Sequence, residues 1–289
     1  MNKYIITTDT TSDLPEDYLK QHNVMLLPLY YNFEGTVYGD KIFLEPQEFY
    51  DKMRKGAMPT TMAVNPEIAK DIFSKLLEEG YDVLHIAFSS ALSGSCSVAT
   101  TVARELIDEH PGAKIIVIDS LCASLGEGLL VHKAVTLKEA GKTIDETAEW
   151  LENNKLNLCH MFTVDDLHHL HRGGRVSKAT AIIGTLINVK PVLHVDNDGR
   201  LIPLNNVRGR KKALLSLVDQ MAESIKNYSG QNDIVFISHG DSYEDAQYVA
   251  NLVKERFGIK EVLINYVSPT IGAHSGPGTI ALFFMGNSR

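Results

Sequence analysis

The sequence predicts an α/β protein with two parts: a Rossmann-like first domain built on a mostly parallel sheet, followed by an α+β second domain. In residues 1–157, short β-rich runs alternate repeatedly with segments whose apolar residues recur at helical spacing, as in a parallel sheet covered on both faces. In residues 158–289, strands joined by a hairpin mix with strands joined by helices. We place the boundary in the polar stretch 152–157.

The composition is that of a soluble globular protein: 289 residues, 44% hydrophobic and 22% charged. The formal net charge of −8 argues against general binding to nucleic acids or anionic membranes. No apolar run approaches the roughly 20 residues of a membrane span, and the start does not resemble a signal peptide, so we expect a cytoplasmic protein. Cys96, Cys122 and Cys159 lack CxxC spacing and are expected to be reduced thiols.

Helix-start signals support the elements of the first half. Asn65 before Pro66 is typical of a helix cap followed by a first-turn proline. Thr143 and Glu146 have capping-box spacing. The two glycines that flank Glu127 lie inside a helical pattern and are best explained by close helix packing. The expected strands are 3–8, 24–33, 83–88 and 114–119, and the expected helices are 16–21, 46–55, one from 66, one from 96, one ending near 140 and one opening at 143.

The second half has the same kinds of signal. Residues 165–175 carry acids at the start, bases at the end and a glycine stop, which is the charge order of a helix. The turn 196–199, Asp-Asn-Asp-Gly, is typical of a hairpin. The expected strands are 158–163, 191–195, 201–207, 233–238, 261–266 and 280–284, and the expected helices are 165–175, 178–187, 210–228 and one ending at 257.

The hydroxyl-rich loop 89–95 is the strongest candidate for a binding site. It follows a buried strand and precedes a helix, the position at which α/β proteins bind ligands with helix N-termini. Because the loop has no lysine or arginine, it suits a weakly charged anion such as one carboxylate. The alternative is that its serines only cap the helix and the turn.

Other polar residues allow a functional and a structural interpretation. Asp9 and Ser12 could order a neighbouring loop, although capping of the following helix is favoured. Thr61 is expected in an extended loop, with its hydroxyl available to other partners. His274 lies in a segment dense in Gly and Pro that we interpret as a turn, where a histidine is not needed for the turn alone.

The charged clusters and the absence of known motifs limit which ligands and cofactors the sequence predicts. The basic run 208–212, with Arg172 and Arg175, could form a positive rim around an anion, or it could be a solvated charged surface. His168 and His171 share a helix face but have no well-placed third ligand, so no metal is expected. The chain lacks GxxxxGK[ST], GxGxxG after a strand and HExxH, so no cofactor is implied.

A serine hydrolase is the alternative from a different class. No GxSxG motif surrounds Ser93 or Ser275. A nucleophile and base pair formed by Ser93 and His274 still stays open, as in a lipid hydrolase or thioesterase.

Short polar motifs follow one another along nearly the whole chain: Asp9–Pro15, Pro59–Thr61, Leu92–Ser95, Gly173–Arg175, Lys190–Pro191, Arg208–Lys212 and His274–Gly278. In this order they resemble the DegV family. The resemblance implies a long-chain fatty acid in a ligand tunnel between the two domains, and in some members a separate fatty acid kinase that converts the acyl carboxylate to acyl phosphate. It implies no catalysis by this chain and leaves transient membrane contact open.

The resemblance also assigns roles to individual residues. Thr61 and Ser93 would donate hydrogen bonds to the carboxylate, with His274 close by. Arg175 and Arg208 would lie on the rim used in phosphotransfer with the kinase. Two segments depart from the family pattern: Met62–Asn65 after Thr61, and His171–Arg172 before the Gly-Gly-Arg motif. These departures bear on which acyl chain is preferred and on which partner is used, more than on the class of ligand.

Overall fold

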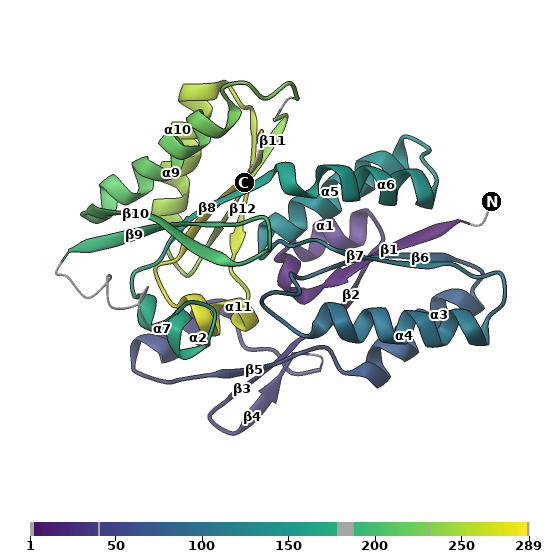
Figure 1. Cartoon of the computed structure of the whole chain (residues 1–289). Coiled ribbons are helices and arrows are strands. Elements are labelled where there is room, and N and C mark those ends of the chain that lie inside the picture. The colour runs from purple at the N-terminus through teal and green to yellow at the C-terminus, as the bar shows by residue number, and fades with distance from the viewer. Residues whose placement is uncertain (1–2, 40, 178–187, 231, 288) are drawn as a thin grey trace.

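Strands β1 (Tyr4–Asp9) and β6 (Asp82–Ala87) are the central strands of a four-stranded parallel sheet (Figure 1). β2 (Val24–Leu27) pairs with β1, and β7 (Ile115–Asp119) pairs with β6. Every residue of β1 and β6 is buried, as expected of strands covered on both faces. The α/β class is therefore confirmed. The computed structural model describes residues 3–39, 41–177, 188–230, 232–287 and 289.

The connections that follow β1 and β6 lie on opposite faces of this sheet. α1 (Glu16–Gln21) links β1 to β2 and packs on one face with α5 (Leu125–Glu139) and α6 (Ile144–Asn154). α4 (Ser95–Glu109) links β6 to β7 and packs on the other face with α3 (Pro66–Glu78). Loops that diverge in this way leave a crevice beyond the carboxyl ends of the two strands.

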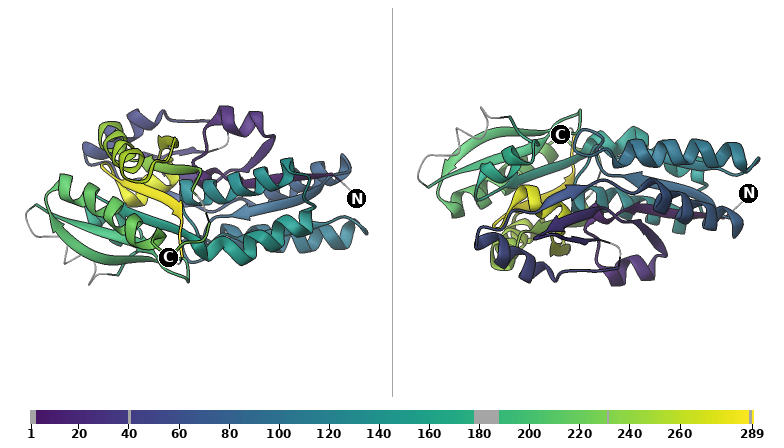
Figure 2. Two further views of the ribbon diagram at one scale, coloured as in Figure 1. Left: turned by 90° about the horizontal axis from the view of Figure 1, so that it is seen from above. Right: turned by 90° about the horizontal axis from the view of Figure 1, so that it is seen from below.

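A second, six-stranded sheet lies beyond those strand ends, and Figure 2 shows it beside the first sheet, with the N-terminus at the far end of the molecule. Its order is β10-β9-β8-β13-β11-β12, and all neighbours are antiparallel except β11 and β12. The strands are β8 (Leu158–Thr163), β9 (Val189–Val195), β10 (Leu201–Arg208), β11 (Ile234–His239), β12 (Glu261–Tyr266) and β13 (Ile280–Met285).

The two faces of the second sheet bury different partners. α9 (Arg210–Ile225) and α10 (Tyr243–Phe257) cover the outer face. β13 is apolar throughout because its side chains alternate between two cores: Leu282 and Phe284 pack under these helices, whereas Ala281 and Phe283 join the core that contains α5.

A small sheet from the first half of the chain packs against the second half. It has the order β4-β3-β5, and α2 and α11 lie beside it. Tyr50 on α2 donates a hydrogen bond to the carbonyl of Val267 at 2.8 Å, and Phe49 packs against Ala273. The elements are β3 (Tyr30–Phe33), β4 (Thr36–Tyr38), β5 (Thr60–Met62), α2 (Pro46–Arg54) and α11 (Pro269–Ser275). The domain boundary after residue 157 stays a prediction.

Most expected elements are present within a residue or two, and the helix starts at Asn65 and at Thr143 are confirmed by their side-chain caps. Three expectations about the elements are wrong. The expected strand 24–33 is divided at Pro28 into β2 and β3, which belong to different sheets. Thr61 lies in strand β5 rather than in a loop, and His274 lies on α11 rather than in a turn. The expected helix 178–187 lies outside the described residues. The remaining short elements are η1 (Thr10–Ser12), η2 (Lys155–Asn157) and α7 (Leu167–Arg172).

The glycines of α5 allow close packing, as the sequence predicted. A Cβ atom on Gly126 would lie 2.2 Å from Nε2 of His160 and 2.9 Å from a ring carbon of Phe283. A Cβ atom on Gly128 would lie 2.6 Å from the carbonyl oxygen of Ser12. The helix therefore touches the loop after β1 and the second sheet at the same time.

Replacement of Gly126 by alanine should destabilise the protein, although alanine is normally the better helix former by about 1 kcal/mol. We expect a loss of about 1–3 kcal/mol in the free energy of unfolding, because the added methyl group meets a packed ring. Urea denaturation would measure it, with Gly94→Ala as the control, since a Cβ atom at Gly94 meets nothing within 4 Å. A stabilised Gly126→Ala protein would contradict this packing.

Candidate functional site

A cavity lies in the crevice between the two large sheets and contains about 950 Å³ of empty space, part of it open to solvent. Its walls come from both halves of the chain, and most of its lining is apolar. The apolar lining residues include Leu29, Met62, Phe88, Leu92, Phe162, Leu170, Val195, Leu201, Ile271, Ala281 and Phe283. A cavity of this kind, with a few polar groups, is typical of a small-molecule site.

Ser93 lines the cavity from the loop between β6 and α4. The loop is folded by two hydrogen bonds to the carbonyl of Ser89, from the backbone N–H groups of Leu92 and Ser93. The hydroxyl of Ser93 accepts a hydrogen bond from the N–H of Ser95 at 3.2 Å and lies 3.0 Å from the Ser95 hydroxyl. Ser93 thus both orders the first turn of α4 and faces the cavity.

Thr61 reaches the cavity because side chains alternate along β5. Thr61 is opposite Tyr31 on the inner face of the small sheet, whereas Thr60 points to the other face and is exposed. Met62, the next residue along the strand, is exposed and also borders the cavity. The hydroxyl of Thr61 is 2.8 Å from Nε2 of His274 on α11. Two residues that are 213 positions apart in the sequence therefore form one polar group.

His274 is a neutral histidine at pH 7. Burial lowers its pKa to about 4, and the positive charges of Arg175 and Arg172 contribute in the same direction. Its ring packs against the backbone of Gly173, where a Cβ atom would lie 2.0 Å from Nδ1. The Gly-Gly-Arg motif therefore makes room for this ring, and a neutral ring can either donate or accept one hydrogen bond toward Thr61.

Arg175 brings a positive charge to the same wall of the cavity. Its guanidinium group donates from Nε and Nη2 to the carbonyl of Leu92, at 3.2 and 3.0 Å, and from Nη1 to the carbonyl of Gly173. Burial lowers the pKa of Arg175. This side chain links the end of α7 to the loop that carries Ser93.

Arg208 is not brought into this group. It is the last residue of β10, its side chain is exposed, and it is not among the described residues that line the cavity. Of the five expected site residues, the structure gathers Thr61, Ser93, Arg175 and His274 around one cavity.

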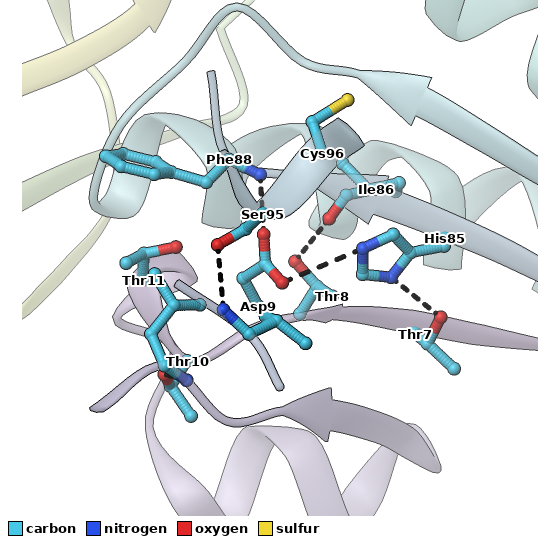
Figure 3. Close-up of polar contacts among 12 residues, drawn as sticks. Thr7, Thr8, Asp9, Thr10, Thr11, His85, Ile86, Phe88, Ser95 and Cys96 are labelled. Atoms are coloured by element: carbon cyan, nitrogen blue, oxygen red, sulfur yellow. Dashed lines mark hydrogen bonds and ion pairs between the residues drawn. The ribbon is translucent and has the colours of Figure 1, made fainter. Parts of the chain in front are cut away.

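Asp9 orders a neighbouring loop, and the favoured interpretation as a helix cap is wrong. Its side chain makes no cap hydrogen bond to η1. Instead Oδ2 accepts a hydrogen bond from the N–H of Phe88 at 2.9 Å, and Oδ1 lies 3.7 Å from Nε2 of His85 (Figure 3). Burial raises the pKa of Asp9 to about 7 and lowers the pKa of His85 to about 3. Ser12 makes no hydrogen bond with its side chain among the described residues.

A second polar part of the wall was missed by the sequence analysis. The hydroxyl of Ser124, at the start of α5, contacts Oδ2 of Asp13 and lies 2.9 Å from the hydroxyl of Ser238 on β11. Oδ1 of Asp13 accepts a hydrogen bond from the N–H of Ser268, and burial raises the pKa of Asp13 to about 7. The positive φ angles of Asp13 and Ser124 mark the tight turns that bring them together, but such angles are not evident from the sequence.

The geometry of a serine hydrolase is not formed by the described residues. Ser93 and His274 are hydrogen bonded to Ser95 and Thr61 rather than to each other. The charged groups that act on His274 are two arginines, and no carboxylate orients its ring. Within the described ranges there is also no group of three or more His, Cys, Asp or Glu residues that could hold a metal, and no helix is long and apolar enough to cross a membrane.

A protein-family model described as "Uncharacterised protein, DegV family" matches residues 3–287. This protein belongs to the DegV family. A DegV domain-containing protein of Clostridium perfringens is 41% identical over 291 residues, covering 100% of this chain and 99% of that protein. One of Lactococcus lactis is 37% identical and covers 96% of both chains.

Solved DegV structures share the fold over nearly the full length. A DegV family protein from Thermus thermophilus, described by its fatty acid binding, is 31% identical, with a TM-score of 0.87 over 99% of this chain and 100% of its own. DegV from Bacillus subtilis, described as a fatty acid binding protein, is 28% identical, with a TM-score of 0.86 over 99% and 100% of the two chains.

The protonation state of His274 in this DegV protein can be tested directly. A pKa of about 4 lies below the ordinary 6.5, so folding disfavours the protonated ring, and stability is lost as pH falls from about 6.5 through about 4. We expect the His274 ring resonances, assigned with a His274→Gln variant, to titrate with a midpoint near 4 in an NMR experiment. A midpoint at or above 6.5 would show that the ring is not held in a dry, cation-flanked site.

Proposed function

We propose that this DegV protein binds a long-chain fatty acid, with the carboxylate near Thr61, Ser93 and His274 and the tail along the apolar part of the cavity. The main supporting observation is that two hydroxyl groups, a neutral histidine and one arginine lie together on the wall of a mostly apolar cavity. These groups suit one carboxylate better than a phosphate, which would call for more cations. The relatives from Thermus thermophilus and Bacillus subtilis described by fatty acid binding support the same ligand class.

The energetics favour retention through the tail. Each buried CH₂ group contributes about 0.8 kcal/mol, so a long alkyl chain supplies most of the binding free energy. A hydrogen bond to an ionised carboxylate adds about 1.5–3 kcal/mol and fixes which end of the ligand faces the hydroxyl groups. Specificity for an acid over a neutral lipid would come from Thr61, Ser93 and Arg175.

We further propose that the protein is a carrier and presents the carboxylate to a separate fatty acid kinase, which would form acyl phosphate. The incomplete hydrolase geometry around Ser93 favours a carrier over an enzyme. Arg208 is exposed and has no ion pair with another described residue, so its charge is available to a partner. A cytoplasmic location belongs to the same proposal, supported by free cysteines at 96, 122 and 159.

The carboxylate site can be tested with a Thr61→Ala, Ser93→Ala double variant. Fatty acid affinity should fall at least tenfold, because even one lost hydrogen bond to a charged group exceeds the roughly 1.4 kcal/mol of a tenfold change. The matched control is Thr60→Ala with Ser90→Ala, which alters the neighbouring exposed hydroxyl residues. Native mass spectrometry and a titration with a fluorescent fatty acid would compare the two, and equal affinities would contradict the site.

The role of Arg208 can be separated from lipid binding. Arg208→Ala should keep its bound fatty acid but support at least tenfold slower acyl phosphate formation with the kinase, because the exposed guanidinium lies away from the cavity lining. Arg200→Ala, in the turn just before the first residue of the same strand, is the charge-matched control. Kinase support equal to that of the control, or a parallel loss of bound lipid, would speak against a partner-facing role.

A further inference from the structure

Glu127 on α5 is a buried carboxyl group that reaches the carboxyl end of β1. Its side chain is fully buried. Oε1 lies 2.7 Å from the hydroxyl of Thr8 and 3.2 Å from the backbone nitrogen of Asp9, and Oε2 lies 2.9 Å from the hydroxyl of Thr11. One side chain therefore holds the end of β1 and the short helix η1 that follows it.

The hydroxyl of Thr8 has more close partners than it has protons. It lies 2.8 Å from the carbonyl oxygen of Ile86 as well as 2.7 Å from Oε1 of Glu127 (Figure 3 shows the contact with Ile86). Each such oxygen–oxygen contact needs a proton between the two atoms. The hydroxyl supplies one proton and the carbonyl supplies none, so the second must come from Glu127.

We infer that Glu127 is protonated in the folded protein and donates its proton to Thr8, as a positioning residue that holds two parts of the cavity wall. The contact with the Asp9 N–H, at 3.2 Å, is at the long end of the range for N–H···O hydrogen bonds, which is compatible with a weak acceptor such as the hydroxyl oxygen of an acid. This inference rests on the hydrogen bonds of the folded chain and does not depend on the proposed ligand.

Among the described residues, the charged groups that act on the Glu127 carboxyl are carboxyl groups, and the nearby cation Arg289 donates to the sulfur of Cys122 instead. Asp9 and Asp13 are carboxyl groups, and Asp9 contacts His85, whose pKa burial lowers to about 3. Burial also lowers the pKa of His160 on β8 and raises that of the Cys122 thiol to about 11. Burial, and next the charge of Asp9, raise the pKa of Glu127 well above its usual range, which agrees with the hydrogen-bond count.

The proton on Glu127 matters for the cavity because the residues that Glu127 contacts form or support the cavity wall. Thr11 lines the cavity directly. Asp9, whose N–H contacts Glu127, accepts a hydrogen bond from the N–H of Phe88, and Phe88 lines the cavity at the start of the loop that carries Ser93. Loss of the proton would leave Thr8 unable to satisfy both Ile86 and Glu127, and would place a negative charge in a dry interior.

The test is the pH dependence of stability in a Glu127→Gln variant of the full chain. The glutamine amide N–H can replace the acid O–H as donor to Thr8, but it does not titrate. The folded state of the wild type binds this proton more tightly than the unfolded state, so wild-type stability falls as pH rises above about 4.5 until pH passes the folded pKa. The stability of the Glu127→Gln variant does not fall in this way, because glutamine has no proton to lose. We therefore expect the difference in unfolding temperature, variant minus wild type, to increase steadily from about pH 5 to about pH 9.

The control is Glu149→Gln, the same change at an exposed position on the neighbouring helix, for which the difference should stay constant. If Glu127 is instead an ionised acceptor, the amide removes an acceptor that the folded state needs. Because Glu127 would then be ionised in both the folded and the unfolded state above about pH 5, the difference would be negative and constant from about pH 5 to about pH 9, and the inference would be overturned.

A second measurement decides the matter even if Glu127→Gln does not fold. In wild-type protein labelled with ¹³C at glutamate carboxyl groups, one resonance should stay at the protonated position at pH 7 while the exposed glutamates have shifted to the ionised position. If all glutamate carboxyl resonances are in the ionised position at pH 7, Glu127 is not protonated and the inference is wrong.

Discussion

Helix α5 contacts both large sheets because two of its residues have no side chain. Gly128 lies against the backbone of Ser12, and Gly126 lies against His160 on the second sheet. Ala123 and Ser124, at the start of the same helix, form part of the cavity wall. Since a larger residue at either glycine would move the helix away from one sheet, the width of the cavity depends on this close approach.

The same helix places a neutral acid between the sheet and the cavity. Glu127 is surrounded by hydroxyl groups and carboxyl groups rather than by cations, and this favours an uncharged state. An uncharged Glu127 behind the cavity wall is compatible with a ligand whose own head group is negative, because it adds no repulsion near that head group. The neutral Glu127 with its hydroxyl partners is therefore electrostatically compatible with the negative head group of the proposed ligand.

The four gathered site residues come from elements whose positions are set by apolar packing. Thr61 faces inward because Tyr31, its partner on β3, belongs to an aromatic cluster with Phe49. His274 approaches Thr61 because α11 packs beside that cluster and because Gly173 leaves room for the ring. The hydrogen bonds of the site are thus consequences of how the small sheet is buried.

Local patterns in the sequence determined the elements, the α/β class and the hydroxyl-rich loop, because periodicity, caps and turn residues act within a few positions. The family resemblance placed Thr61 and His274 near one ligand, but their direct hydrogen bond, the role of Asp9 and the position of Arg208 were decided only by the tertiary structure. Thr61 and His274 are 213 positions apart, and no local pattern reports which strands and helices meet over that separation. Asp9 was assigned as a cap because local rules treat it with its own helix, whereas burial beside β6 gave its carboxylate to Phe88.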